Sequence, residues 1–150
     1  MRNIIKHRAV LTISVLVVVL VSLFSIFNSP GSGDAAATEP SKLLVVWTSG
    51  DKDVAMSMAY MYTYNAKKQG WFDEVRFLIW GPSSRLLAGD KELQEYLAKM
   101  KDAGVELQAC IACANMYGVT DDLRKLGVDV RGMGRPLTDM LKSGWKTVTF

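Results

Sequence analysis

Two cysteines, Cys110 and Cys113, are the residues best suited to chemistry, and they stand in a C-x-x-C spacing within residues 107–119. They follow an alternating run typical of a strand and begin a pattern typical of a short helix. At a helix N-terminus, free N–H groups and the helix dipole favour the thiolate, which is the nucleophilic form. The second thiol could resolve a sulfenic acid or close a disulfide. The alternative interpretation is two small buried side chains that only pack.

The only histidine, His7, lies close to the N-terminus, so the rest of the chain has none. This excludes Ser-His-Asp and Cys-His nucleophile pairs within one chain. It also removes the usual nitrogen ligands of zinc, copper and haem. Two cysteines cannot complete a four-ligand zinc site, so only a site shared between subunits stays open and we expect no metal.

The segments that must position the cysteines alternate between strand and helix patterns. Short apolar runs predict strands at 43–47, 75–80, 105–109, 128–131 and 145–150. Amphipathic runs with caps predict helices at 53–70, 83–88, 91–104, 112–117, 121–126 (capped by Thr120) and 136–142. This rhythm is typical of a parallel sheet of about five strands with helices on both faces.

In parallel sheets the ligand crevice lies at the carboxyl ends of the strands. The candidate substrate-binding residues in the loops expected there are Ser49, Gly50, Asp51, Gly81, Ser83 and Arg135. Arg135 could hold an anionic sulfur species or simply face solvent, and Asp51 could accept a proton or only form a turn. The glycines match no nucleotide-binding motif and are explained by turn chemistry.

The N-terminal part of the chain has the composition of a membrane segment. Residues 1–30 contain a basic start and an uncharged apolar run from Ala9 to Phe27, and residues 31–41 read as a flexible linker before a domain at 42–150. An uncleaved anchor and a signal peptide cleaved near Ala35–Ala37 compete, and the length of the run favours the anchor. Either way the positive flank predicts an exported, periplasmic or extracytoplasmic domain, attached to the membrane or secreted after cleavage.

Charge gives no reason to expect a nucleic-acid partner. The net charge of +3 comes from the N-terminal basic residues, and the remainder is nearly balanced. Met56, Met58 and Met61 share one predicted helix. Methionines in an exported protein can bind copper, but a core or subunit-interface helix explains this spacing better.

The C-x-x-C spacing invites comparison with thioredoxin, but the thiols come after two strand–helix units and Pro136 opens a helix. The run LQACIACANMYGV resembles instead the active-site segment of the DsrE/DsrF-like proteins, the TusD/YchN-type sulfur-relay family. LLVVWTSGD, FLIWGPSSRLL and GRPLTDMLKSGWKTVTF resemble the family's first strand, second strand and closing helix and strand, in the same order. The resemblance spans residues 42–150.

The resemblance implies a three-layer α/β/α, flavodoxin-like fold and a homo-oligomer built on trimers, up to a hexamer. It implies a persulfide on Cys110 that passes to or from a donor or acceptor protein, with no cofactor. Cys113 stands where TusD-type members have a small residue, so its role, including that of a resolving thiol, is not covered by the resemblance. The well-studied relatives are cytoplasmic, and an exported C-x-x-C pair would tend to oxidise.

Three functions therefore remain to be weighed. The first is persulfide carriage or sulfur transfer on Cys110. The second is dithiol redox chemistry or redox sensing that uses Cys110 and Cys113 together. The third is a non-catalytic oligomeric binding subunit with buried, inert thiols.

Overall fold

Five short runs rich in β-branched and apolar residues form the strands of residues 39–150, the part of the chain that the computed structural model describes. The strands are β1 Lys42–Trp47, β2 Glu74–Ile79, β3 Glu106–Cys110, β4 Asp129–Arg131 and β5 Lys146–Thr149. All neighbours pair in parallel, in the order β4-β3-β2-β1-β5. The predicted five-stranded parallel sheet is confirmed, and its carboxyl ends meet along one edge.

Helical segments occupy the predicted intervals between the strands. They are α2 Lys52–Val54, the π-helix η1 Ala55–Tyr60, α3 Met61–Lys68, α4 Ser83–Gly89, α5 Lys91–Asp102, α6 Ile111–Met116, α7 Thr120–Lys125 and α8 Gly134–Lys142. Asp90 caps α5 as predicted, because its carboxylate accepts the backbone N–H of Leu93. The predicted cap at Thr120 is wrong: Val119 is the N-cap, and the Thr120 hydroxyl donates to Asn115 Oδ1 at 2.7 Å.

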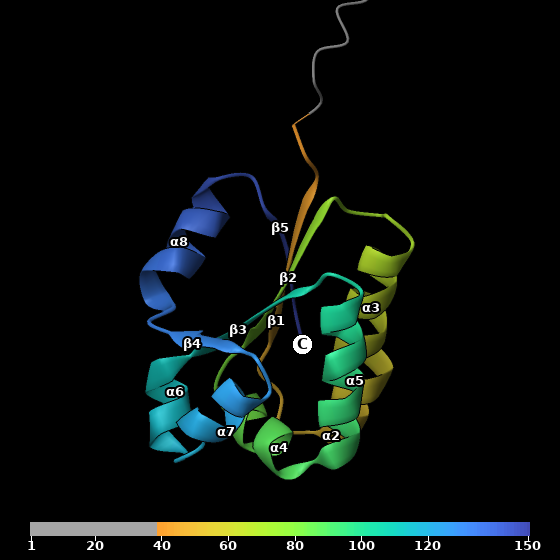
Figure 1. Cartoon of the computed structure of the whole chain (residues 1–150). Coiled ribbons are helices and arrows are strands. Elements are labelled where there is room, and N and C mark those ends of the chain that lie inside the picture. Colours follow the sequence, from red (N-terminus) through yellow and green to blue (C-terminus); the bar gives the residue numbers. More distant parts are fainter. Residues whose placement is uncertain (1–38) are drawn as a thin grey trace, which may run out of the picture. The chain divides into compact units, whose positions relative to one another are not determined.

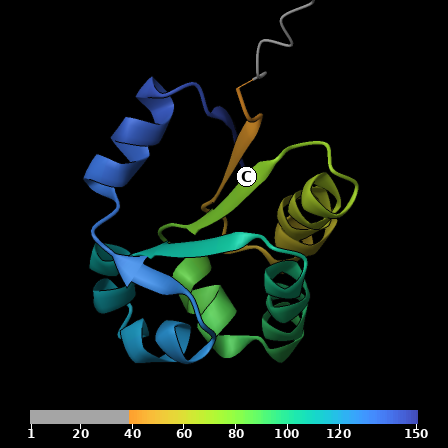
Figure 2. The ribbon, with the colours of Figure 1, turned by 45° about the horizontal axis from the view of Figure 1, so that its top comes forward.

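The order of the strands explains how the helices are layered. The chain steps from β1 to β4 in one direction and then returns to place β5 beside β1. Since crossovers between parallel strands are right-handed, the last connection puts α8 on the opposite face from α3 and α5, as Figures 1 and 2 show. The flavodoxin comparison is wrong for the strand order, which is 2-1-3-4-5 in that fold. Sequence alternation does not specify on which side of β1 the last strand pairs.

Strand alternation divides the core into two apolar clusters. Along β1, Leu43, Val45 and Trp47 belong to the larger cluster, whereas Leu44 and Val46 belong to the smaller one. The smaller cluster lies on the face that carries α8, because it includes residues before, on and after that helix: Met133, Leu137, Met140 and Trp145. Cys110 belongs to this second cluster.

The predicted helix 53–70 exists, but its middle is a π-helix. The wider turn places residues five apart on one face, which accounts for the full burial of both Ala55 and Tyr60. Tyr60 packs edge-on against Trp47 and Phe77, with each pair of ring centroids 5.2 Å apart. The methionines divide: Met56 packs against the larger cluster, while Met58 and Met61 are half exposed.

The described residues begin just before the sheet. Ser41 is tied to the turn before β2, where its backbone N–H and its hydroxyl both donate to the Asp73 carboxylate. These hydrogen bonds hold the pKa of Asp73 below its ordinary value. Within residues 39–150 no helix is long and apolar enough to cross a bilayer. The predicted membrane segment at 9–27 and most of the predicted linker lie outside the described residues.

Candidate functional site

Cys110 is the last residue of β3 and the N-cap of α6, with an extended backbone (φ −77°, ψ 115°). Its side chain is 6% exposed and faces the α8 side of the sheet, among Leu78, Met133 and the other members of the smaller cluster. The predicted strand-to-helix junction is therefore present, with the sulfur in apolar surroundings at the carboxyl edge of the sheet. Such surroundings keep most water away from the Cys110 sulfur.

Cys113 lies in the first turn of α6, packs against the same cluster and is only half buried. Burial raises the pKa of its thiol, and the neighbouring Cys110 thiol raises it further. A hydrogen bond from the backbone of Gly81 acts in the opposite direction. The two sulfurs are thus neighbours, both are free thiols, and Cys113 is the more accessible of the pair.

The turn after β2 supports the thiols from the adjacent strand. Gly81 has φ +72°, a conformation that glycine adopts without strain, and its backbone contacts Cys113. Ser83 is fully buried, and its hydroxyl donates to Trp47 O at 2.7 Å and accepts from Trp80 N at 3.1 Å. Ser83 therefore joins the ends of β1 and β2, and its hydroxyl is already occupied by the backbone.

The polar candidates after β1 are likewise occupied by local hydrogen bonds. Ser49 Oγ accepts the Asp51 N–H at 3.0 Å. The Asp51 carboxylate accepts from the N–H groups of Asp53 and Val54, at 2.7 and 3.2 Å, and so caps α2. The preceding Thr48 N–H donates to Phe150 O at 2.7 Å, which holds the start of this loop against the residue that follows β5. These contacts fix the loop shape, and substrate binding by Ser49 and Asp51 stays a prediction.

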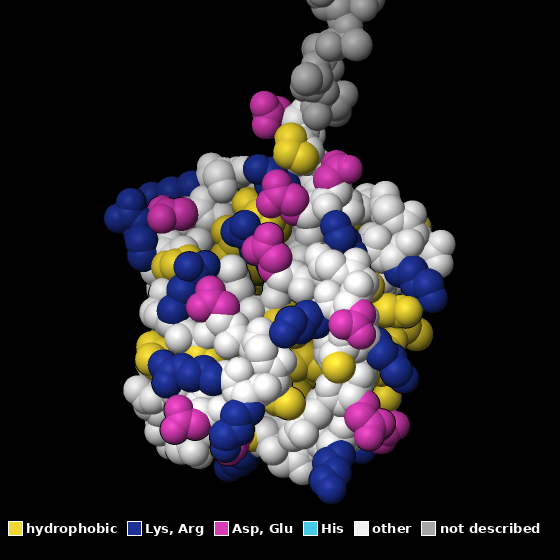
Figure 3. All heavy atoms as spheres, in the orientation of Figure 1, with side chains coloured by type: hydrophobic (Ala, Val, Ile, Leu, Met, Phe, Trp, Pro, Cys, Tyr) yellow, Lys and Arg dark blue, Asp and Glu magenta, His cyan; other side chains and the backbone are white. Residues whose placement is uncertain are grey.

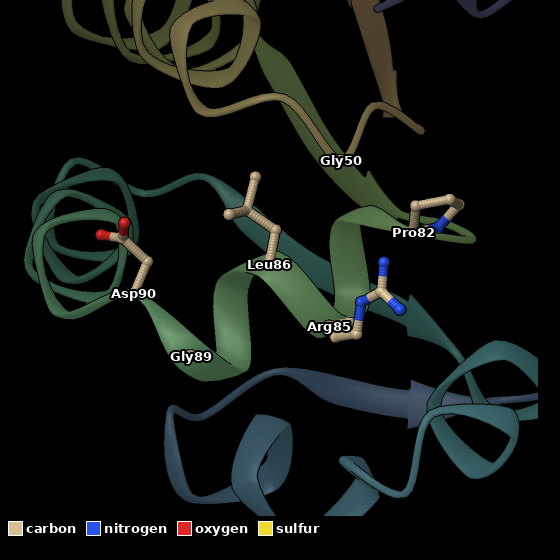
Figure 4. A pocket seen from close by; sticks show the side chains of 6 residues that line it. All are labelled: Gly50, Pro82, Arg85, Leu86, Gly89 and Asp90. Carbon is tan, nitrogen blue, oxygen red and sulfur yellow. The ribbon is translucent and has the colours of Figure 1, made fainter.

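A surface pocket of about 290 Å³ lies beside this loop and α4. Its lining residues are Gly50, Pro82, Arg85, Leu86, Gly89 and Asp90, and Figure 4 shows Arg85 and Leu86 extending from α4 toward the Gly50 loop. The Asp90 carboxylate is engaged by Lys52 at 2.9 Å and by its cap hydrogen bond. The lysine and that cap hydrogen bond hold the Asp90 pKa below its ordinary value. Gly50 thus lines this pocket, and its part in substrate binding stays a prediction.

Arg85 is the residue that the sequence interpretation missed. It is exposed, lines the pocket, and places its guanidinium carbon 5.3 Å from the centre of the Tyr117 ring, which follows α6. It therefore joins the pocket to the helix that carries Cys113. The available signal was its position one turn after Gly81, on a helix that starts at the carboxyl edge.

Arg135 is at the start of α8, as predicted, and its side chain faces solvent. Its side chain is 86% exposed, and its Nε lies 2.8 Å from Asp139 Oδ1 and 3.0 Å from Oδ2. This is an i,i+4 pair on a helix surface, which matches the solvent-facing alternative.

Among residues 39–150 no three His, Cys, Asp or Glu side chains gather in a way that could hold a metal ion. On the face shown in Figure 3, lysines and arginines lie among aspartates and glutamates, without a field of one sign. The site is therefore built from two neighbouring thiols, one backbone N–H group, an apolar wall and a nearby pocket with one arginine. This arrangement suits thiol and sulfur exchange.

Comparison with known proteins identifies one matching family model and several solved structures with a similar fold. The family model described as the DsrE/DsrF-like family matches residues 22–150. No protein with a curated description matches the chain.

Three solved structures share the fold. The conserved protein of unknown function BT1422 from Bacteroides thetaiotaomicron is 36% identical, with a TM-score of 0.71, over 73% of this chain and 95% of that one. The ychN protein from E. coli is 17% identical, and MTH1491 from Methanobacterium thermoautotrophicum, also of unknown function, is 20% identical. Both have a TM-score of 0.60 over 73% of this chain and 99% of theirs.

Proposed function

Because the chain belongs to the DsrE/DsrF-like family, a family linked to sulfur relay, we propose that it carries or transfers sulfane sulfur as a persulfide on Cys110. The observation that carries the proposal is the position of this sulfur at the carboxyl edge of β3, inside an apolar cluster. In open parallel sheets, ligands bind in the crevice at the carboxyl ends of the strands.

The chemistry is a thiol exchange that balances without a cofactor. The Cys110 thiolate attacks the outer sulfur of a donor persulfide, and the bond between the donor's two sulfurs breaks. The donor leaves as a thiolate and takes up the proton that Cys110 has lost. The transferred sulfur stays bonded to Cys110 until a thiolate of the acceptor repeats the reaction.

The residues around Cys110 shield its sulfur and limit which donors can reach it. At 6% exposure, Cys110 can be reached only by a narrow group, such as the persulfide end of a small molecule or of a protruding donor cysteine. The apolar side chains around it keep the persulfide from water and from bulky oxidants. The half-buried Cys113 lies next to Cys110 and is more accessible to solvent.

Intact-mass spectrometry of the full-length chain after incubation with a persulfide donor tests this function. Wild-type protein gains one sulfur atom, and Cys110→Ser gains none. An equal gain by Cys110→Ser, or no gain by wild type, contradicts the proposal.

Dithiol redox chemistry is a second candidate, favoured by the contact between Cys110 and Cys113. It requires a reversible intramolecular disulfide. Differential alkylation after oxidation and reduction detects that bond, and two freely alkylated thiols after mild oxidation exclude it.

The proposal also includes attachment of the domain to the membrane and its assembly into an oligomer. The apolar run 9–27 anchors an exported domain to the membrane, and exposed apolar side chains on the long helical segment, Met58 and Met61, contribute to a homo-oligomer. Intact mass of protein from membrane and soluble fractions reports whether the N-terminal segment is retained. Light scattering of wild type and Met61→Glu tests the assembly, which should weaken in the variant.

A further inference from the structure

Cys113 has no task in a relay that uses only Cys110. It nevertheless lies three residues along, contacts the Cys110 thiol, packs against the same apolar cluster and faces the Gly81 backbone. Cys110 is an extended N-cap and Cys113 lies in the first helical turn, which is the arrangement of reactive C-x-x-C pairs. The position of the second thiol therefore calls for a reaction between the two.

We propose that Cys113 discharges the persulfide: its sulfur displaces the sulfane sulfur from Cys110 as hydrogen sulfide and leaves a Cys110–Cys113 disulfide. This rests on the proposed persulfide of Cys110. It gives the carrier a second outcome, sulfide release, when no acceptor takes the sulfur.

The step balances within the loaded protein. The Cys113 thiolate attacks Sγ of Cys110, the Sγ–S bond of the persulfide breaks, and a new Sγ–Sγ bond forms. The outer sulfur leaves as HS⁻ and takes up the proton that Cys113 has lost. The Cys113 sulfur is oxidised from thiol to disulfide, the Cys110 sulfur keeps its oxidation state, and the outer sulfur is reduced to sulfide, so no external oxidant or reductant enters. A cellular dithiol or monothiol then reduces the disulfide and restores the carrier.

The residues around Cys113 support its attack on the Cys110 persulfide and also limit the rate of that attack. The Gly81 backbone hydrogen bond stabilises charge on the attacking Cys113 sulfur. Cys113 is the more accessible of the two sulfurs, so the thiol that later reduces the disulfide can reach it there. Burial keeps the Cys113 pKa high and its thiolate scarce at neutral pH, which leaves the persulfide time to meet an acceptor.

The test compares full-length wild type, Cys113→Ser and Cys113→Ala, with Ala112→Ser as a matched control in the same helical turn. Each protein is loaded with one equivalent of a low-molecular-weight alkyl persulfide, freed of donor and kept without reductant. Intact mass follows the loaded form and the disulfide, and a sulfide-trapping reagent measures release. Wild type and Ala112→Ser should convert to the disulfide with one sulfide per chain. Both Cys113 variants should stay loaded at least about tenfold longer, because the intramolecular attack is gone.

Equal lifetimes of the loaded form in wild type and the Cys113 variants overturn the inference and leave persulfide carriage standing. Loss of sulfur from wild type without a disulfide overturns it as well, and this result does not depend on any variant. Failure of all four proteins to gain sulfur removes the proposed function, and the discharge step with it.

Discussion

Replacing Ser83 with alanine should destabilise the contact between the ends of β1 and β2, next to the strand that ends at Cys110. The Ser83 hydroxyl is fully buried and bonds to backbone atoms at the ends of β1 and β2: Trp47 O at 2.7 Å, Trp80 N at 3.1 Å and Trp80 O at 3.1 Å. The next residue, Ser84, is equally buried, but within residues 39–150 its hydroxyl has no hydrogen-bond partner. The two serines thus form a matched pair.

The magnitudes follow from the number of bonds that each variant loses. Ser83→Ala loses one donated hydrogen bond, shared between Trp47 O and Trp80 O, and one accepted from Trp80 N, which corresponds to about 2 kcal/mol of unfolding free energy. For a domain of this size that lowers Tm by roughly 8 °C. Ser84→Ala removes a desolvated hydroxyl that bonds to nothing, so the change should lie within about 0.5 kcal/mol of zero or be stabilising. Thermal and urea denaturation of both variants, followed by circular dichroism, measures the difference. Equal destabilisation by the two substitutions would refute the hydrogen-bond reasoning.

Three further predictions concern residues near the thiols. Asp51→Ala should lose the cap of α2 and cost about 1 kcal/mol in urea denaturation without changing sulfur loading; a large loss of loading would restore Asp51 as a proton acceptor. Arg85→Ala should slow loading from an anionic persulfide donor about threefold to tenfold in a stopped-time mass assay, whereas the solvent-facing control Arg135→Ala should not. In Cys110→Ser, alkylation of Cys113 should keep accelerating as pH rises past its ordinary pKa of 9.0, because burial favours the neutral thiol and only higher pH forms the thiolate. A rate that levels off below that pH would contradict the burial effect.

The parts of the fold that could be predicted from sequence are those set by local physics. Runs such as LLVVW and FLI predict buried strands because β-branched and large apolar residues fit a two-sided sheet. Asp90 predicts a helix start, and Gly104, at φ +91°, marks the end of the same helix. The position of Cys110 at the end of β3 follows from the same alternation.

The parts that sequence could not give depend on contacts between distant segments. The pairing of β5 beside β1 is a choice among sheet edges, which alternation leaves open. Ser83 looked like a turn residue available to a substrate, but its partner Trp47 O is 36 positions away and reveals itself only in the folded chain. The π-helix likewise coincides with the burial of both Ala55 and Tyr60 against the sheet, and the helical spacing of the sequence does not reveal it.

The relation between the two cysteines could be predicted from the sequence only in part. Spacing predicts that they are neighbours, yet it does not say which sulfur is buried. The structure buries Cys110 and leaves Cys113 partly exposed, because Cys110 ends a strand inside the smaller cluster and Cys113 packs against the cluster from α6. Cys110 is therefore the more protected thiol and Cys113 its more accessible neighbour.

The location of the transferred sulfur is the most direct test of persulfide carriage on Cys110. Cys113→Ser is loaded with a persulfide donor, alkylated, digested and sequenced by tandem mass spectrometry. We expect one extra sulfur on Cys110 in this variant, and none on Cys113 when Cys110→Ser is treated in the same way. No extra sulfur on Cys110, or equal loading of Cys113 in Cys110→Ser, would contradict persulfide carriage at this site.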